Sequence, residues 1–275
     1  SALTMVYGKL SVSEELLMYI SNHFDVGGST GSTEVRDNAF EVITATWVKV
    51  LELIGGGSNS GGLAALASPR AASADSEEVR LATVSFQELG WFFLSIITRA
   101  LSLKVIEKNE VADESNRKSR YTDRFSKALT KLILQSNEAR RVSVQGFDFF
   151  NRMLAKFMID LYRYMDRGFV SSLVSAHLSE LAKEAKVTTI FRFKFLQTLA
   201  EYEHFVALNQ PVTRGIESSQ SSEAIRQAYW RTHFIVGHYI NEFKTLLATG
   251  EEGRLTRAKS IAKLRDLLWK HSLDP

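Results

Sequence analysis

The chain has 275 residues, of which 45% are hydrophobic and 24% are charged, proportions that are ordinary for a globular protein. It contains no cysteine, which excludes disulfides, thiolate metal sites and a cysteine nucleophile within this sequence. The formal net charge of +3 is small for a nucleic-acid-binding protein, and the apolar stretches fall short of the roughly 20 residues that cross a bilayer, so we expect neither a nucleic-acid partner nor a membrane-spanning helix.

Helical patterns begin near the start of the sequence. Ser13 can cap a helix that runs to about His23, and Glu14 is favourable in its first turn. Thr33 can cap a second helix, whose apolar residues fall on one face at helical spacing. That face consists of Phe40, Ile43, Trp47, Val50 and Leu51.

The middle of the chain continues this pattern. Ser85 and Glu88 form the S-x-x-E arrangement of a capping box directly before an apolar helix that ends at about Val105. Thr122 can cap the next helix. The apolar residues of that helix are Phe125, Leu129, Leu132 and Ile133, and a following stripe consists of Phe147, Phe150, Leu154, Phe157 and Leu161.

The remaining helices and the near absence of strand-like alternation set the fold class. Further helices are predicted at 168–182, 188–200, 222–247 and 255–271. The sequence has only three prolines, and because proline interrupts helices, its scarcity permits long ones. We therefore predict an all-α fold of stacked antiparallel helices with irregular armadillo- or HEAT-like repeats, an α-solenoid segment that spans residues 1–275 as one unit. No clean repeat period is visible in the sequence.

Three segments are predicted to be loops. Residues 55–76 contain the run GGGSNSGG at Gly55 to Gly62, followed by a stretch rich in Ala and Ser. This composition is typical of a flexible linker, either a natural low-complexity loop or an engineered replacement for a longer one. The two other loops, 107–119 and 211–222, are predicted to be exposed, because the first is dense in charge and the second is rich in Ser with Pro and Gly.

The histidines are the first place to look for catalytic or metal chemistry. His238 and Glu242 are four residues apart on a predicted helix and could share a metal, and His204 follows Glu203 near a helix end. A surface His–Glu pair and a packed histidine are the ordinary alternatives. The sequence contains no HExxH, GxxxxGK[ST] or GxGxxG pattern. We therefore predict no catalytic residue, no metal site and no cofactor.

A basic stretch is the best charged candidate for a binding site. It consists of Arg117, Lys118, Arg120, Arg124, Lys127 and Lys131. Such a stretch can contact an acidic partner or anionic lipid headgroups, and we assign that contact to its first four residues. The alternative is a solvated loop and helix start, because acidic residues precede the stretch closely.

Several blocks, in chain order, resemble the dedicator-of-cytokinesis family. They are SRYTDRF at Ser119–Phe125, MDRGFV at Met165–Val170, KFLQTLAEYEHFVALN at Lys194–Asn209, YWRTHFIVG at Tyr229–Gly237 and LRDLLWKHSLDP at Leu264–Pro275. The most specific block, MDRGFV, is similar to the zizimin-type and zizimin-related branches. The resemblance covers roughly residues 85–275. The chain departs from the family at Ala200, Tyr202 and Ala207, where a cysteine, a histidine and a proline are frequent.

The resemblance implies a place within a longer protein. In this family a C2-like domain binds phosphoinositides, and a C-terminal domain exchanges nucleotide on Rho-family GTPases of the Rac or Cdc type. A long armadillo-like helical region lies between them, and the matching blocks belong to that region. The resemblance therefore implies that this segment lacks the lipid-binding and exchange machinery, and that the longer protein is cytoplasmic and recruited to membranes.

Together these observations favour a non-catalytic scaffold and protein-interaction segment of a Rho-family guanine-nucleotide exchange factor. We expect its partner to be an adaptor or regulatory protein, or a second copy of the chain. GTPase contact would occur only through the exchange domain, and membrane contact would be indirect. One alternative is a helical metal- or ligand-binding enzyme domain that uses His238, Glu242 and His204; a second is a basic membrane-surface module that uses the stretch from Arg117 to Lys131.

Overall fold

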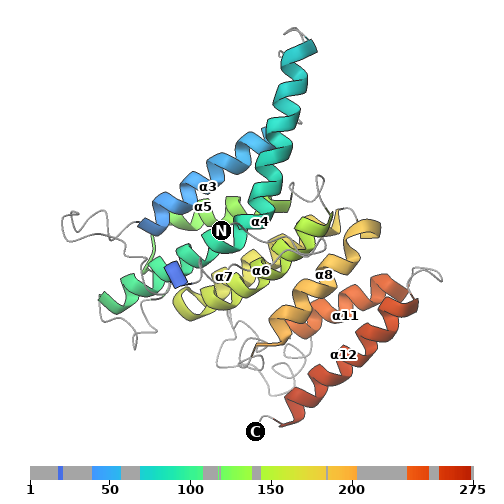
Figure 1. The fold of residues 1–275 in the computed structure, drawn as a ribbon. Coiled ribbons are helices and arrows are strands. Elements are labelled where there is room, and N and C mark those ends of the chain that lie inside the picture. Colours follow the sequence, from blue (N-terminus) through green and yellow to red (C-terminus); the bar gives the residue numbers. More distant parts are fainter. Residues whose placement is uncertain are drawn as a thin grey trace. The chain divides into compact units, whose positions relative to one another are not determined.

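Helices make up every regular element in the part of the chain that the computed structural model describes (Figure 1). The described residues are 18–20, 39–56, 69–107, 117, 119–137, 144–183, 185–202, 234–247 and 254–273. The long helices are α3 (Ala39–Gly56), α4 (Pro69–Glu107), α5 (Asp123–Ser136), α6 (Val144–Tyr164), α7 (Arg167–Ala182), α8 (Ala185–Ala200), α11 (Phe234–Leu247) and α12 (Arg254–Leu273). The all-α prediction is confirmed for these ranges.

The chain divides into two compact units, Ser1–Asp166 and Arg167–Pro275. Each unit contains helices that pack against one another, and each is described by itself. A continuous solenoid that spans residues 1–275 as a single segment stays a prediction.

The N-terminus of α5 illustrates how the sequence sets a helix boundary in the first unit. Thr122 has an extended backbone, and its hydroxyl oxygen accepts a hydrogen bond from the backbone N–H of Phe125 at 3.1 Å. The same hydroxyl donates to Oε1 of Glu41 in α3 at 2.6 Å. The predicted cap at Thr122 is therefore confirmed, and the structure adds that this cap also joins α5 to α3.

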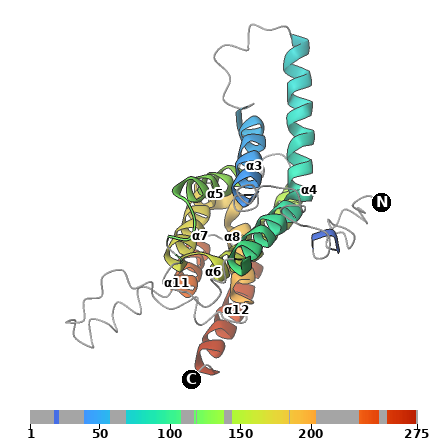
Figure 2. The ribbon, with the colours of Figure 1, turned by 90° about the vertical axis from the view of Figure 1, so that its left-hand side faces the viewer.

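Aromatic side chains form the core where α3 meets its neighbours. α3 packs against α4 and α5 (Figures 1 and 2). The ring of Phe40, which is almost fully buried, lies edge-on to Tyr121 and Phe125, with centroids 5.5 and 4.6 Å away. Nζ of Lys104, in α4, lies 4.7 Å from the centroid of the Phe40 ring. Burial of each such ring contributes about 1.5–3 kcal/mol, and the edge-on geometry and the cation add to it.

α4 and α6 approach each other closely because glycines lie at their contact. A β-carbon at Gly90 would lie 2.6 Å from two ring carbons of Phe150, a fully buried residue of α6. A β-carbon at Gly146 would meet the side chain of Gln87. A glycine inside a helix costs about 1 kcal/mol relative to alanine, so close packing is what makes glycine favourable at these positions.

The second unit is arranged around α8. This helix packs against α7, α11 and α12, and α11 packs against α12. Because α8 has neighbours on several sides, it is buried over most of its circumference rather than along one stripe. The helices predicted at 168–182, 188–200 and 255–271 are confirmed with small shifts of their ends, and the helix predicted at 222–247 is described from Phe234 onward.

Two predictions about the region before α4 were wrong. α4 begins at Pro69, so residues 69–76 are helical and do not belong to a flexible loop. Ser85 and Glu88 lie inside α4 and do not cap its start. Proline is favourable at the first helical position, and alanine has the highest helix propensity, so the Pro- and Ala-containing stretch is a helix start. Residues 57–68 and 108–116 and the loop predicted at 211–222 lie outside the described residues, as do Ser13 and Thr33.

Among the described residues, one stretch of α4 is long and apolar enough to cross a membrane, contrary to the expectation from the sequence. It covers Gln87–Ile106, and half of it is buried inside the structure. A core helix passes the same test of length and composition, and α4 packs against α3 and α6.

Candidate functional site

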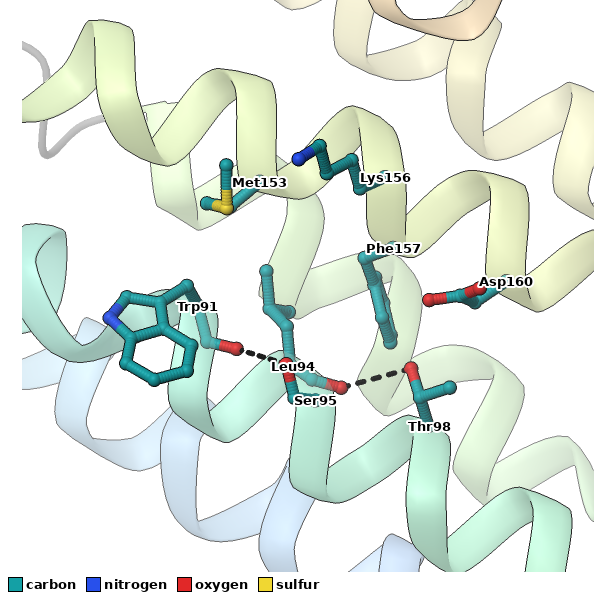
Figure 3. Close-up of a pocket in the computed structure, with 8 residues that line it drawn as sticks. All are labelled: Trp91, Leu94, Ser95, Thr98, Met153, Lys156, Phe157 and Asp160. Atoms are coloured by element: carbon teal, nitrogen blue, oxygen red, sulfur yellow. Dashed lines mark hydrogen bonds between the residues drawn. The ribbon is translucent and has the colours of Figure 1, made fainter. Parts of the chain in front are cut away.

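A pocket lies between α4 and α6 in the first unit (Figure 3). Its volume is about 340 Å³, and it is lined by Trp91, Leu94, Ser95, Thr98, Met153, Lys156, Phe157 and Asp160. Each helix contributes four residues at the spacing i, i+3, i+4 and i+7, so the walls are two facing helical stripes. The hydroxyls of Ser95 and Thr98 donate to carbonyl oxygens four residues earlier in α4, at 2.7 and 3.1 Å. Most of the remaining wall is apolar or aromatic.

Charged groups lie on the α6 side of this pocket. Lys156 is exposed, and the carboxylate of Asp160 is 3.3 Å from Nη1 of Arg163. Burial raises the pKa of Asp160, and the opposing effect of Arg163 is smaller. An apolar wall beside a carboxylate suits the binding of an apolar side chain that has a basic neighbour. The arrangement is therefore suited to recognition.

Arg192 is a buried residue of the second unit whose side chain has several hydrogen-bond partners. It is 1% exposed, and its Nε donates to Oε2 of Glu242 in α11 at 2.7 Å. Its Nη1 donates to the carbonyl oxygen of Leu181 in the last turn of α7 at 3.3 Å, and its Nη2 donates to the hydroxyl of Thr189 at 3.2 Å. One side chain of α8 thus joins α7 and α11.

His238 and Glu242, which the alternative metal-binding hypothesis paired, have separate partners in the structure. Nε2 of His238 lies 3.3 Å from Oγ of Ser175 in α7, whereas the carboxylate of Glu242 binds Arg192. Burial lowers the pKa of His238. His204 lies outside the described residues. In the ranges that the structure describes, no group of three or more His, Asp or Glu is arranged to hold a metal ion.

Two of the four residues predicted for acidic-partner or lipid contact, Arg117 and Arg120, contact the end of a helix. Nη1 of Arg117 donates to the carbonyl oxygen of Tyr162 at 3.5 Å, and Nη1 of Arg120 donates to that of Tyr164 at 3.1 Å. These carbonyls belong to the last turn of α6, where backbone acceptors have no partner within the helix and where positive charge is favourable. Both arginines therefore stabilise the C-terminus of α6.

Of the other two residues of the predicted contact, the structure describes only Arg124. Arg124 is exposed on α5, as is the neighbouring Lys127. Lys118 lies outside the described residues. Contact of the basic stretch with lipid or with an acidic partner stays a prediction, and Arg124 and Lys127 are among its exposed residues.

Arginine contacts to helix C-termini recur in the second unit. Besides Arg192 at the end of α7, Nη1 of Arg257 donates to the carbonyl oxygen of Leu246 near the end of α11 at 3.3 Å. In both cases the arginine follows its acceptor by 11 residues, across a short connection. Sequence reasoning missed these contacts, although that spacing is a usable local signal. The contacts of Arg117 and Arg120 span 45 and 44 residues, and no local signal could have found them.

Comparisons with known proteins match this chain to a helical domain of a known family. The family model described as "DOCK6-11, TPR domain" matches residues 63–200, which include α4 to α8. Dedicator of cytokinesis protein 9 of Mus musculus is 28% identical over 193 residues, protein 8 of Homo sapiens is 28% identical over 219 residues, and protein 11 of Danio rerio is 26% identical over 216 residues.

These matches cover only a small part of each relative's sequence. Each covers 67% of this chain, but only 9% of protein 9 and 10% of proteins 8 and 11, so the chain spans about a tenth of the length of the curated relatives it matches. No solved structure matches the chain. Since the family model covers half of the sequence and agrees with its helical architecture, the chain belongs to the dedicator-of-cytokinesis family, in the branch of the DOCK6-11 TPR domain.

Proposed function

We propose that the chain is a non-catalytic scaffold and protein-interaction segment of a longer guanine-nucleotide exchange factor for Rho-family GTPases. Membership of the DOCK6-11 family and the small share of the relatives' length that the chain spans support this proposal. In it, exchange activity and membrane recruitment belong to other parts of a cytoplasmic protein, and this segment binds an adaptor or regulatory protein and positions the exchange domain.

The observation that carries the proposal is the pocket between α4 and α6. Its two facing stripes offer an apolar wall, and the hydroxyls of Ser95 and Thr98 are bonded to their own helix. A groove between paired helices takes an apolar anchor from a partner peptide or helix. The carboxylate of Asp160 adds a preference for a basic residue beside that anchor.

Two measurements test the proposal. The immobilised chain is used to capture adaptor and regulatory proteins, and each candidate is then purified and titrated by calorimetry. We expect Met153→Lys, in the pocket wall, to weaken binding about tenfold or more, which is about 1.4 kcal/mol, because it places an ammonium group against apolar surface. Arg152→Lys, an exposed change next to it on α6, serves as the matched control and should leave the affinity unchanged.

The second measurement is release of a fluorescent guanine nucleotide from Rho-family GTPases. We expect the chain alone to leave the intrinsic release rate unchanged. Acceleration of release by the chain alone, or a purified partner that binds the Met153→Lys variant as tightly as the parent, would overturn the proposal in this form.

A further inference from the structure

α12 exposes large apolar residues on the side opposite its buried face. Ser260 and Leu267, seven residues apart, are 5% and 0% exposed on the side of the helix that packs within the unit, where α12 contacts α8 and α11. In contrast, Ile261 is 55% exposed and Trp269 is 65% exposed. A helix that packs along one side normally places polar residues along the other. The opposite side of α12 therefore has the composition of a second contact surface.

The exposed residues form one continuous stripe. Ala258, Ile261, Ala262, Arg265 and Trp269 follow the spacing i, i+3, i+4, i+7 and i+11, and all five are exposed. We call this stripe the outer α12 face. Its two alanines leave room for another helix to approach closely, and its two large residues provide the apolar area that such a contact buries.

The charged residues of α12 indicate which kind of partner helix would fit the outer α12 face. The sequence of α12 has six Lys or Arg and one Asp. Arg257 donates to a backbone carbonyl of α11, and Nζ of Lys263 lies 3.8 Å from Oε1 of Glu201, so these two cations have acceptors inside the unit. Arg265 is different: its side chain is 81% exposed, and its 3.9 Å contact with the exposed Asp266 contributes little because water screens it. The outer α12 face is therefore apolar with a cation in its middle.

We propose that the outer α12 face docks an acidic amphipathic helix of a partner protein. This inference rests on the proposed function and deepens it by naming a surface and the chemistry of its partner. Apolar residues of the partner helix cover Ile261 and Trp269, and an Asp or Glu on the same stripe pairs with Arg265. A lipid surface fits less well, because Arg265 lies between the two apolar residues and would be drawn toward the hydrocarbon with them.

The test titrates the whole chain with a labelled synthetic helix that has Leu at i, i+3, i+4 and i+7 and Glu beside that stripe. A peptide with Lys in place of Glu is the matched probe. We expect the acidic peptide to bind at least about tenfold more tightly than the basic one, and increasing salt to weaken its binding. Trp269→Ala and Arg265→Glu should each weaken acidic-peptide binding by about tenfold or more, and Arg265→Glu should favour the basic peptide.

Val42→Ala provides the control, because Val42 is 63% exposed on α3 in the first unit and lies outside the proposed surface. It should leave peptide affinity unchanged. Because the altered residues are exposed, the variants should keep the helix content of the parent, which circular dichroism checks.

Three outcomes would overturn the inference. The first is acidic-peptide binding that Trp269→Ala and Arg265→Glu leave unchanged. The second is a dimer, detected by light scattering, that Trp269→Ala dissociates, which would assign the face to a second copy of the chain. The third is binding to phosphatidylserine vesicles that depends on Trp269 while the acidic peptide fails to bind. In all three cases a partner that still requires the pocket at Met153 would leave the proposed function standing.

Discussion

The two units specify the packing of their helices by different means. In the first unit, α3, α4 and α5 meet through the rings of Phe40, Tyr121 and Phe125, and α4 meets α6 across Gly90. In the second unit, a buried arginine bonds to three other residues, among them a carboxylate of α11 and a carbonyl of α7. Apolar packing therefore sets the spacing of helices, whereas a buried charge selects particular partners and is costly to leave without them.

The largest expected effect is the loss of one member of the buried ion pair. Glu242→Leu leaves the guanidinium of Arg192 buried without its carboxylate, and we expect the free energy of unfolding to fall by about 3–5 kcal/mol. Urea denaturation followed by circular dichroism measures this loss.

The double variant Arg192→Met/Glu242→Leu is the control for this prediction. It removes both charges, so we expect it to be more stable than Glu242→Leu and to recover much of the loss. A double variant as unstable as the single one would indicate that packing volume, and not the charge, distinguishes the second unit.

The next effect concerns the helix spacing of the first unit. Gly90→Leu places a side chain where Phe150 lies, and we expect it to cost about 1–3 kcal/mol in urea denaturation. Gly237 in α11 offers a matched control, because a β-carbon there would meet nothing within 4 Å. Gly237→Ala should be neutral or stabilise the chain by up to about 1 kcal/mol, and destabilisation by both changes would contradict a role for close approach at Gly90.

A smaller effect is expected at the cap of α5. Thr122→Ala removes the acceptor for the N–H of Phe125 and the donor to Glu41, and we expect a loss of about 1 kcal/mol. Thr122→Ser keeps both hydrogen bonds and should retain most of the stability. If serine and alanine are equally destabilising in the same denaturation assay, the methyl group and not the hydroxyl carries the effect.

The smallest expected effect is on the pH dependence of folding stability, which should differ between a histidine of the second unit and an aspartate of the first. Burial lowers the pKa of His238 below its ordinary value of 6.5, so the unfolded chain binds a proton more readily than the folded one. The stabilising contribution of neutral His238 is present above pH 6.5 and is lost as pH falls toward the folded pKa. We expect His238→Gln to reduce the loss of stability between pH 7 and acidic conditions, measured by urea denaturation at several pH values.

For Asp160 in the first unit, the dependence of folding stability on pH has the opposite sign to that of His238. Burial raises its pKa above 3.8, so the folded chain binds the proton more readily, and its contribution is present below pH 3.8 and lost as pH increases through the folded pKa. Asp160→Asn should therefore improve stability near neutral pH relative to acidic pH. Parallel pH profiles for Asp160→Asn and His238→Gln would contradict this contrast between the units.

Sequence patterns correctly predicted features that depend on residues close together along the chain, namely helix faces and a helix cap. The stripe from Phe147 to Leu161 lies in α6 as a buried helical face, and the cap at Thr122 is where the pattern placed it. The start of α4 at Pro69 was missed because a composition rich in Ala and Ser was interpreted as a loop, whereas proline is favourable at the first helical position and alanine has the highest helix propensity.

Contacts between distant segments were beyond such reasoning. The acceptors of Arg117 and Arg120 come from α6, and the pocket forms only when stripes of α4 and α6 face each other. The outer α12 face is a similar case. Its spacing is visible in the sequence, but which side of α12 is buried depends on α8 and α11.

The guanidinium of Arg192 also has a consequence for how the second unit opens. Because it bonds to α7 and α11 from α8, separation of any one of these helices breaks contacts that the others share. The three helices should therefore behave as one cooperative block, and their backbone amide protons should exchange with solvent deuterium at a common rate set by a single opening event.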